Sequence, residues 1–337
     1  MGLATKRGLL MICLTAALAL LGGCSSAGHA TGQAQSSGVH IPSNLTGHAD
    51  GTPISLTPVK HVHFAYFILP GERVYRLFYW SGGRRVEAYL DVPPGIGPNP
   101  GGAFDLLVSL HGGEVFPEPF HYKGFPTVTA QVAANEAWSQ DLVFLPNYRG
   151  YGGSPGPVGG AYDSYIDTVN GLKALGELRG LRIAPRATYL EGASLGGYVA
   201  MRLAAQDPNV RAMVLDSPYP GATLTMRWFL SQSTGTLDGT DLSFETGLLR
   251  HYGADIGAPI WARRSVPFQD VRVPTLLIAG TKDPILPAAL ERLTFTGLMA
   301  QNPNDQLEFF PTGHAPSTQA AFRSTTDWLF SHGLNLQ

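Results

Sequence analysis

The chain has 337 residues, of which 44% are hydrophobic and 14% are charged, and its formal net charge is −2. These values are typical of a globular protein and exclude a disordered or fibrous one. The balanced charge offers no basic surface for phosphate groups, and the sequence has no zinc-knuckle or helix-turn-helix spacing, so we expect no nucleic-acid partner.

Residues 1–23 have the layout of an export signal. Lys6 and Arg7 precede an apolar run of about a dozen residues, which is shorter than a typical transmembrane helix. The run closes on Gly22, Gly23 and Cys24, an ending that resembles the bacterial lipobox, in which cleavage leaves a lipidated cysteine. We therefore expect a protein anchored through Cys24 to a bacterial membrane outside the cytoplasm, in the periplasm or on the cell surface. The alternative is a cleaved secretory signal that contains this cysteine by chance.

The cysteine count supports the lipid anchor. The only other cysteine, Cys13, lies inside the apolar run, so the exported part would have no disulfide framework. Residues 24–58 are rich in Ser, Gly, Thr and His and have few large apolar side chains, which predicts a flexible tether. The tether would hold a folded domain, residues 59–337, away from the membrane.

The folded domain is predicted to begin with antiparallel strands and to continue with alternating strands and helices. Residues 104–110 form a continuous apolar run, which is typical of a strand buried on both faces of a sheet. The alternation predicts an α/β fold with a mostly parallel, doubly wound sheet, whose functional loops lie at the carboxyl ends of the strands. Strands are predicted at 61–69, 72–80, 84–92, 104–110, 141–146, 187–192, 211–216, 273–280 and 306–310, and helices at 128–138, 165–178 and 195–205.

About sixty residues separate Asp216 from Pro274, where a minimal fold needs one crossover helix. Residues 218–266 include the bulky side chains of Trp228, Phe229 and Trp261. This segment is either a set of surface helices that pack aromatic rings into the core or a helical cap over a pocket.

The pattern Gly192-x-Ser194-x-Gly196 stands between a predicted strand and a predicted helix. With 41 glycines in the chain the pattern alone could arise by chance, so its interpretation as a nucleophile turn depends on the predicted strand before it and the predicted helix after it. Serine is a weak nucleophile unless a neighbouring base takes its proton, and a tight turn flanked by glycines exposes the serine oxygen to such a base. Ser194 is therefore the candidate nucleophile.

The base and the acid are expected on later strand ends. His314 follows the last predicted strand in a loop rich in Gly and Pro, and Asp283 lies three residues after Gly280, where a buried run ends. The carboxylate would hold the imidazole in the correct tautomer. Asp216, at the end of the adjacent strand, is the alternative acid. The chain order Ser194, Asp283, His314 is the one expected for this sheet architecture.

Two other histidine positions carry a weaker signal. His332 lies at the end of the last helix, where a histidine commonly caps the helix terminus. His61 and His63 share one face of a predicted strand, but no third ligand is nearby in the sequence. We therefore expect no metal and no cofactor.

The reaction also needs donors for the developing oxyanion. The run 104–110 is followed by His111, Gly112 and Gly113, and glycines let backbone N–H groups approach a negative charge without obstruction. The N–H groups of Leu195 and Gly113 are the predicted donors. The alternative is a plain turn that happens to contain two glycines.

Five motifs resemble those of the prolyl oligopeptidase type of α/β-hydrolase: LHGGE, PNYRGYGGSPG, GASLGGYVAM, VPTLLIAGTKDPILP and GHAP. The resemblance covers about residues 72–332 and implies the α/β-hydrolase fold with Ser194, Asp283 and His314 as the catalytic triad. Two features depart from that family. The chain has no room for the propeller domain of its peptidases, and Glu114 stands where proline is common. Arg149, in the second motif, either ties its loop down, which we favour, or contacts substrate.

Together these features predict a serine hydrolase that forms an acyl-enzyme on a small-molecule substrate. An ester substrate is favoured, and a prolyl oligopeptidase-like peptidase or aminopeptidase is the alternative. A binding lipoprotein that keeps the hydrolase fold without activity is the hypothesis of a different class.

Overall fold

The computed structural model describes residues 49–60, 73–93, 104–122, 128–129, 141–178, 185–232 and 239–335. Several predictions concern residues outside these ranges. They are the export signal, the lipidation site at Cys24, the strand at 61–69 and all but the first two residues of the helix at 128–138.

The described strands form a single sheet of nine, in the order β1-β2-β3-β5-β4-β6-β7-β8-β9. The first four strands in this order pair antiparallel, and from β5 onwards the strands pair parallel, so the prediction of a mostly parallel sheet is confirmed. The strands are β1 Pro53–Pro58, β2 Arg73–Ser81, β3 Arg84–Val92, β4 Leu106–Leu110, β5 Leu142–Pro146, β6 Thr188–Ala193, β7 Val210–Asp216, β8 Thr275–Gly280 and β9 Gln306–Phe310.

Strand β1 corrects the predicted extent of the tether, which was drawn to residue 58. Pro53–Pro58 form an antiparallel pair with β2, and Leu56 packs against the core. The pairing is not readable from the local composition, because an edge strand of this length depends on a partner that supplies its hydrogen bonds. Pro53–Pro58 are therefore part of the sheet.

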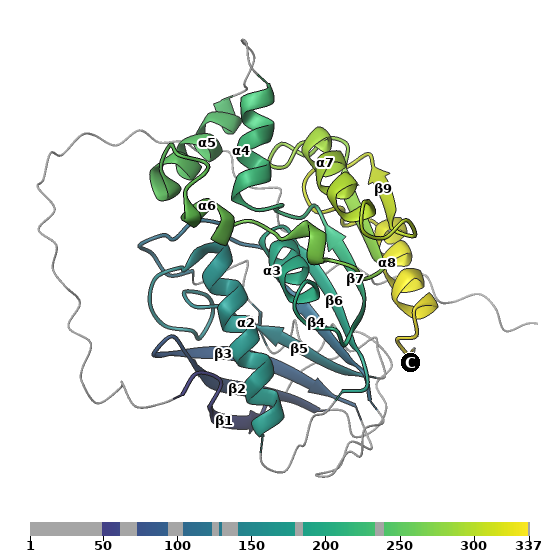
Figure 1. Cartoon of the computed structure of the whole chain (residues 1–337). Coiled ribbons are helices and arrows are strands. Elements are labelled where there is room, and N and C mark those ends of the chain that lie inside the picture. Colours follow the sequence, from purple (N-terminus) through teal and green to yellow (C-terminus); the bar gives the residue numbers. More distant parts are fainter. Residues whose placement is uncertain are drawn as a thin grey trace, which may run out of the picture.

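Helices cover both faces of the sheet (Figure 1). The side chains of each central strand alternate between two cores, as in β5, where Leu142 and Phe144 enter one core and Val143 and Leu145 enter the other. The first core also contains residues of α2, α3 and α7, and the second contains residues of α8. The helices are α2 Gly160–Glu177, α3 Leu195–Ala204, α4 Ala222–Ser231, α5 Gly239–Tyr252, α6 Pro259–Arg263, α7 Ala288–Met299 and α8 Gln319–Ser331, with a 3-10 turn η2 at Phe268–Asp270.

Helix α2 begins at Gly160 rather than at the predicted Tyr165. The additional first turn contains small side chains that fit closely: Ala161 is buried, and the Ser164 hydroxyl donates to the Gly160 carbonyl. The prediction followed large apolar residues and therefore missed this turn.

The segment 218–266 forms α4, α5 and α6, which lie together at the end of the molecule away from β1–β3 (Figure 1). Trp228, Phe229 and Trp261 are buried in the same core as the sheet. The interpretation as helices that pack aromatic rings into the core is thus confirmed, whereas a mobile cap stays a prediction.

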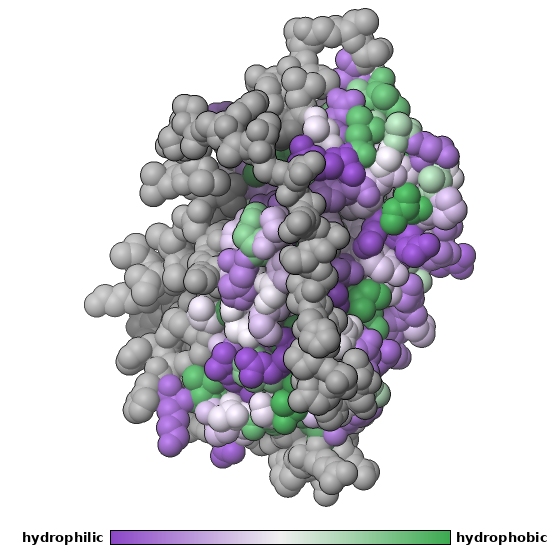
Figure 2. Space-filling view, turned by 90° about the vertical axis from the view of Figure 1, so that its left-hand side faces the viewer, coloured by the Kyte–Doolittle hydropathy of each residue, from purple (hydrophilic) through white to green (hydrophobic). Residues whose placement is uncertain are grey.

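The surface seen in Figure 2 mixes polar residues with single apolar ones over its described part. Within the described ranges, every helix is too short or too polar to cross a membrane.

Candidate active site

Ser194 lies at the turn between β6 and α3, at the carboxyl end of a parallel strand. Its φ of 53° and ψ of −116° are rare for a non-glycine residue, and such strain is common where a side chain must be held for function. The two motif glycines permit this turn. A Cβ atom at Gly192 would lie 2.6 Å from the carbonyl carbon of Gly196, and one at Gly196 would lie 2.6 Å from that of Leu110.

Asp283 and His314 lie on the loops that follow β8 and β9, and they form one hydrogen-bonded pair. The Nδ1–H of His314 donates to Oδ2 of Asp283 over 2.7 Å, and both side chains are almost fully buried. The other oxygen, Oδ1, accepts from the backbone N–H groups of Ile285 at 2.8 Å and Leu286 at 2.9 Å. The carboxylate is thus held rigidly, and it orients the imidazole as a triad requires.

The turn after β7 joins the serine and histidine loops. The backbone N–H of Ser194 donates to the carbonyl of Asp216 over 2.8 Å. The next residue, Ser217, accepts from the backbone N–H of Ala315 at 3.2 Å, directly after the histidine. Ser217 and Ala315 both have positive φ, of 44° and 52°, so the two loops meet in tight conformations. Sequence reasoning missed Ser217, because its role depends on a partner 98 residues away.

The predicted oxyanion donors lie beside the serine. Leu195 opens α3, and the first N–H group of a helix has no acceptor within the helix. Gly112 is close to Ser194: a Cβ atom there would lie 3.3 Å from the serine Cβ. Gly113 packs against the hydroxyl of Tyr151, which accepts from the backbone N–H of Glu114 at 2.8 Å. The backbone N–H of Glu114 is therefore occupied, and on this loop the N–H groups of Gly112 and Gly113 remain as candidate donors to an oxyanion.

His111 and Tyr151 shape this loop, and neither had a predicted role. Nδ1 of His111 lies 2.6 Å from the carbonyl oxygen of Gly112, and its ring packs on Tyr148 with centroids 4.3 Å apart. Burial lowers the pKa of His111 to about 4, so its imidazole is neutral at physiological pH. The only signal in the sequence was the position of His111 at a strand end before two glycines.

Asp216 does not have the role of the alternative acid in this structure, because His314 bonds to Asp283 instead. Burial raises the pKa of Asp216 well above its usual range, and the nearby charge of Asp283 raises it further. Asp216 contributes its backbone carbonyl to the serine turn, as described above.

Arg149 ties its loop down, as we favoured. Its guanidinium donates to both carboxylate oxygens of Asp167 on α2, over 2.6 to 3.2 Å, and lies 3.4 Å from Asp163. The Asp167 side chain is completely buried. A guanidinium held in this bidentate way is occupied, so the loop that carries Tyr148 and Tyr151 is fixed to α2.

Glu114, which departs from the family pattern, is held by a tyrosine. The hydroxyl of Tyr122 donates to its Oε1 over 2.7 Å, and the ring of Tyr122 stacks on Tyr151 with centroids 5.0 Å apart. A carboxylate therefore stands two residues after Gly112, at the rim of the site.

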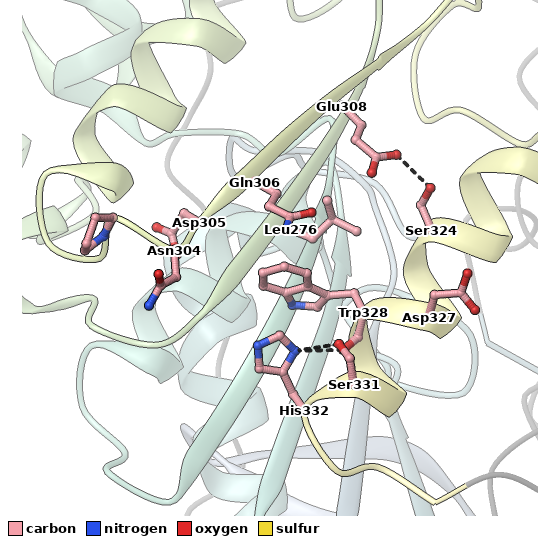
Figure 3. A pocket seen from close by; sticks show the side chains of 11 residues that line it. Leu276, Asn304, Asp305, Gln306, Glu308, Ser324, Asp327, Trp328, Ser331 and His332 are labelled. Atoms are coloured by element: carbon pink, nitrogen blue, oxygen red, sulfur yellow. Dashed lines mark hydrogen bonds between the residues drawn. The ribbon is translucent and has the colours of Figure 1, made fainter.

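His332 is the C-cap residue of α8, as predicted, with Nδ1 2.8 Å from the carbonyl of Trp328. It lines a pocket of about 730 Å³ between β9 and α8 (Figure 3). The pocket lies at the start of β9, whereas the triad lies at the carboxyl strand ends, so this pocket is separate from the candidate site. In the described part of the chain, no three metal-ligating side chains are grouped to hold an ion.

The chain matches a family model described as the alpha/beta hydrolase family over residues 106–323. No curated protein matches the sequence significantly.

Three solved structures show the same fold at low sequence identity. The acetyl xylan esterase from Paenibacillus sp. R4 has a TM-score of 0.57 and 15% identity, with 83% of this chain and 89% of that chain covered. The Pyrococcus furiosus esterase Pf2001 has a TM-score of 0.52 and 14% identity, with 82% and 97% covered. The Pyrococcus horikoshii acylaminoacyl peptidase has a TM-score of 0.53 and 14% identity, with 81% covered, but this chain spans only 49% of that peptidase.

Proposed function

Because the chain belongs to the alpha/beta hydrolase family, we propose that it is a serine hydrolase whose nucleophile is Ser194. The observation that carries the proposal is the 2.7 Å hydrogen bond between His314 and the buried Asp283 carboxylate, on loops that meet the strained serine turn.

In the proposed reaction, the Oγ of Ser194 attacks the carbonyl carbon of the substrate while Nε2 of His314 takes its proton. The N–H groups of Leu195 and Gly113 stabilise the oxyanion. The protonated imidazole then gives its proton to the leaving group, and an acyl-enzyme remains on Ser194. Water attacks this ester with His314 again as the base, which releases the acid and restores the serine. Asp283 keeps the imidazole in the tautomer that both steps need.

We propose a carboxylic ester as the substrate. The chain covers nearly the whole length of the two esterases but about half of the acylaminoacyl peptidase, which supports the ester. A peptide or aminoacyl substrate is the second candidate, because the same nucleophile, base and oxyanion donors serve both reactions.

We also propose that the enzyme is located outside the cytoplasm, where a lipid attached to Cys24 anchors it to the membrane. The support is the arrangement of Lys6, Arg7 and the apolar run before Gly22, Gly23 and Cys24 in the sequence.

A fluorophosphonate probe, which reacts only with an activated serine, tests the proposed function. We expect labelling of the wild type and no labelling of Ser194→Ala, with ester turnover lowered at least about 10⁴-fold in the variant. Ser331→Ala, an exposed serine outside the site, is the control and should label normally. Absence of labelling of the folded wild type, under conditions that label a known serine hydrolase, would instead favour the binding lipoprotein.

Hydrolysis rates on p-nitrophenyl esters and on aminoacyl anilides then distinguish an ester substrate from a peptide or aminoacyl substrate.

A further inference from the structure

Three buried carboxyl groups, one of them the candidate acid Asp283, interact electrostatically with one another. They belong to Asp283, on the loop after β8, to Asp216, at the end of β7, and to Glu291, in the first turns of α7. Their exposed fractions are 8%, 9% and 0%. The proposed reaction uses only Asp283, so the two other groups need an explanation, since buried carboxyl groups are rare unless they are paired.

The three carboxyl groups differ in the number of hydrogen-bond donors that reach them. Asp283 accepts from three donors, namely His314 and the backbone N–H groups of Ile285 and Leu286, and this set favours its ionised form. In contrast, both carboxyl oxygens of Glu291 and Oδ1 of Asp216 have no hydrogen-bond partner among the described residues. A buried carboxylate without donors is strongly unfavourable, so Glu291 holds a proton. For Asp216, burial and the charge of Asp283 favour the protonated form, against the opposing effect of a hydrogen bond with Ser217.

Electrostatics leads to the same assignment. Burial raises the pKa of Glu291 well above its usual range, and the neighbouring carboxyl groups of Asp283 and Asp216 raise it further. The two other elements that pack on α7 are α4 and η2, whose charged residues Arg227 and Asp270 are exposed. Among the described neighbours, no buried cation therefore offsets a charge on Glu291. One negative charge is shared by three carboxyl groups, and the donor set places it on Asp283.

We propose that Glu291 is a positioning residue for the catalytic acid: as a neutral carboxylic acid, it keeps the single negative charge of the three groups on Asp283, where that charge holds His314. This inference rests on the proposed function, because the pair that it serves is the acid and base of that reaction. An ionised Glu291 would compete with Asp283 for a proton, and a protonated Asp283 would no longer control the tautomer of His314.

The first test counts protons and does not depend on activity. The folded protein holds a proton on Glu291 that the unfolded chain releases above the usual glutamate range, so stability falls as pH rises. One such proton makes the unfolding equilibrium constant rise about tenfold per pH unit between the two pKa values. We expect Glu291→Gln to remove this step, and the exposed Glu177→Gln on α2 to keep it. The infrared C=O band of a protonated carboxylic acid should weaken in Glu291→Gln only.

The second test measures the pH profile of ester hydrolysis. At alkaline pH the wild-type Glu291 would ionise and bring a second negative charge beside the Asp283–His314 pair, whereas Glu291→Gln stays neutral at every pH. We therefore expect the pH profiles of kcat/KM of the two proteins to differ at alkaline pH, with kcat of the variant at neutral pH lowered less than about tenfold. Glu291→Leu is also neutral and loses no hydrogen bond among the described residues, so we expect its pH profile to change in the same direction with KM unchanged. A merely structural role of Glu291 would change stability in both variants without moving the profile.

The proposal is overturned if Glu291→Gln has the same pH slope of unfolding as the wild type, because Glu291 would then be ionised. A loss of turnover in Glu291→Gln as large as in Asp283→Asn would overturn it too, because a charge on Glu291 would then be required. If the wild type proves inactive, the proposed function fails, while the unfolding and infrared measurements still decide the protonation of Glu291.

Discussion

Ser194 has a backbone conformation whose strain is of the order of 1–3 kcal/mol, with φ at 53°. Two kinds of contact keep it there. Its N–H donates to Asp216, and its carbonyl accepts from Gly197 at 3.0 Å and Tyr219 at 2.9 Å. The strain is thus offset by backbone hydrogen bonds with three residues, and the backbone that carries the serine side chain is held in place before any substrate binds.

The acid assignment is testable at the same scale. Asp283→Asn keeps the shape of the side chain but reverses the polarity of its bond to His314, so the imidazole adopts the wrong tautomer. We expect kcat to fall about 10⁴-fold with little change in KM, measured by steady-state ester hydrolysis. Thermal unfolding of the variant checks that the fold persists.

Asp216→Asn is the matched comparison, because Asp216 is buried in the same cluster without a bond to His314. A loss of turnover from Asp216→Asn alone as severe as that from Asp283→Asn would reverse the assignment.

Helix α5 lies against the loop that carries Gly113, one of the two proposed oxyanion donors. Phe116 of that loop packs on Phe244, His251 and Tyr252 of α5, with the His251 ring stacked at a centroid distance of 5.2 Å. Gly247 allows this approach, because a Cβ atom there would lie 2.5 Å from the Phe116 ring. Helix α5 therefore supports this loop through the ring of Phe116.

Replacing Phe116 tests this support. We expect Phe116→Ala to lower the free energy of unfolding by about 3–5 kcal/mol, because a buried ring is lost, and to speed hydrogen exchange in α5. Turnover should fall as well, since Gly113, one of the two proposed oxyanion donors, lies on the same loop. Phe120→Ala removes a ring that is 45% exposed a few residues later and serves as the control. Equal effects of the two variants would argue against a specific contact with α5.

At the scale of the molecule, the parallel strands bring distant residues to one end of the sheet. Ser194, Asp283 and His314 follow β6, β8 and β9, and the carboxyl ends of parallel strands share one edge. The described part begins at residue 49, and the proposed anchor lies before it.

The anchor is tested with the whole protein. We expect Cys24→Ser to abolish lipidation and to move the protein from the membrane fraction to the released fraction, because a lipid chain supplies the membrane affinity. Metabolic labelling with a fatty acid and membrane fractionation measure both effects. Membrane retention of the unlipidated variant would count against the lipobox interpretation.

The sheet class and the candidates Ser194, Asp283 and His314 could be predicted from the sequence, because each follows a local signal: a turn that only glycines permit, or the end of a buried run. The choice between Asp283 and Asp216 as the partner of His314 required the folded structure, since the two residues lie at the ends of adjacent strands. The folded structure also revealed β1, which depends on its pairing with β2, and the buried Glu291, whose neighbours come from other loops. Local backbone geometry leaves a trace in nearby residue types, whereas burial and long-range contacts arise only when distant segments pack.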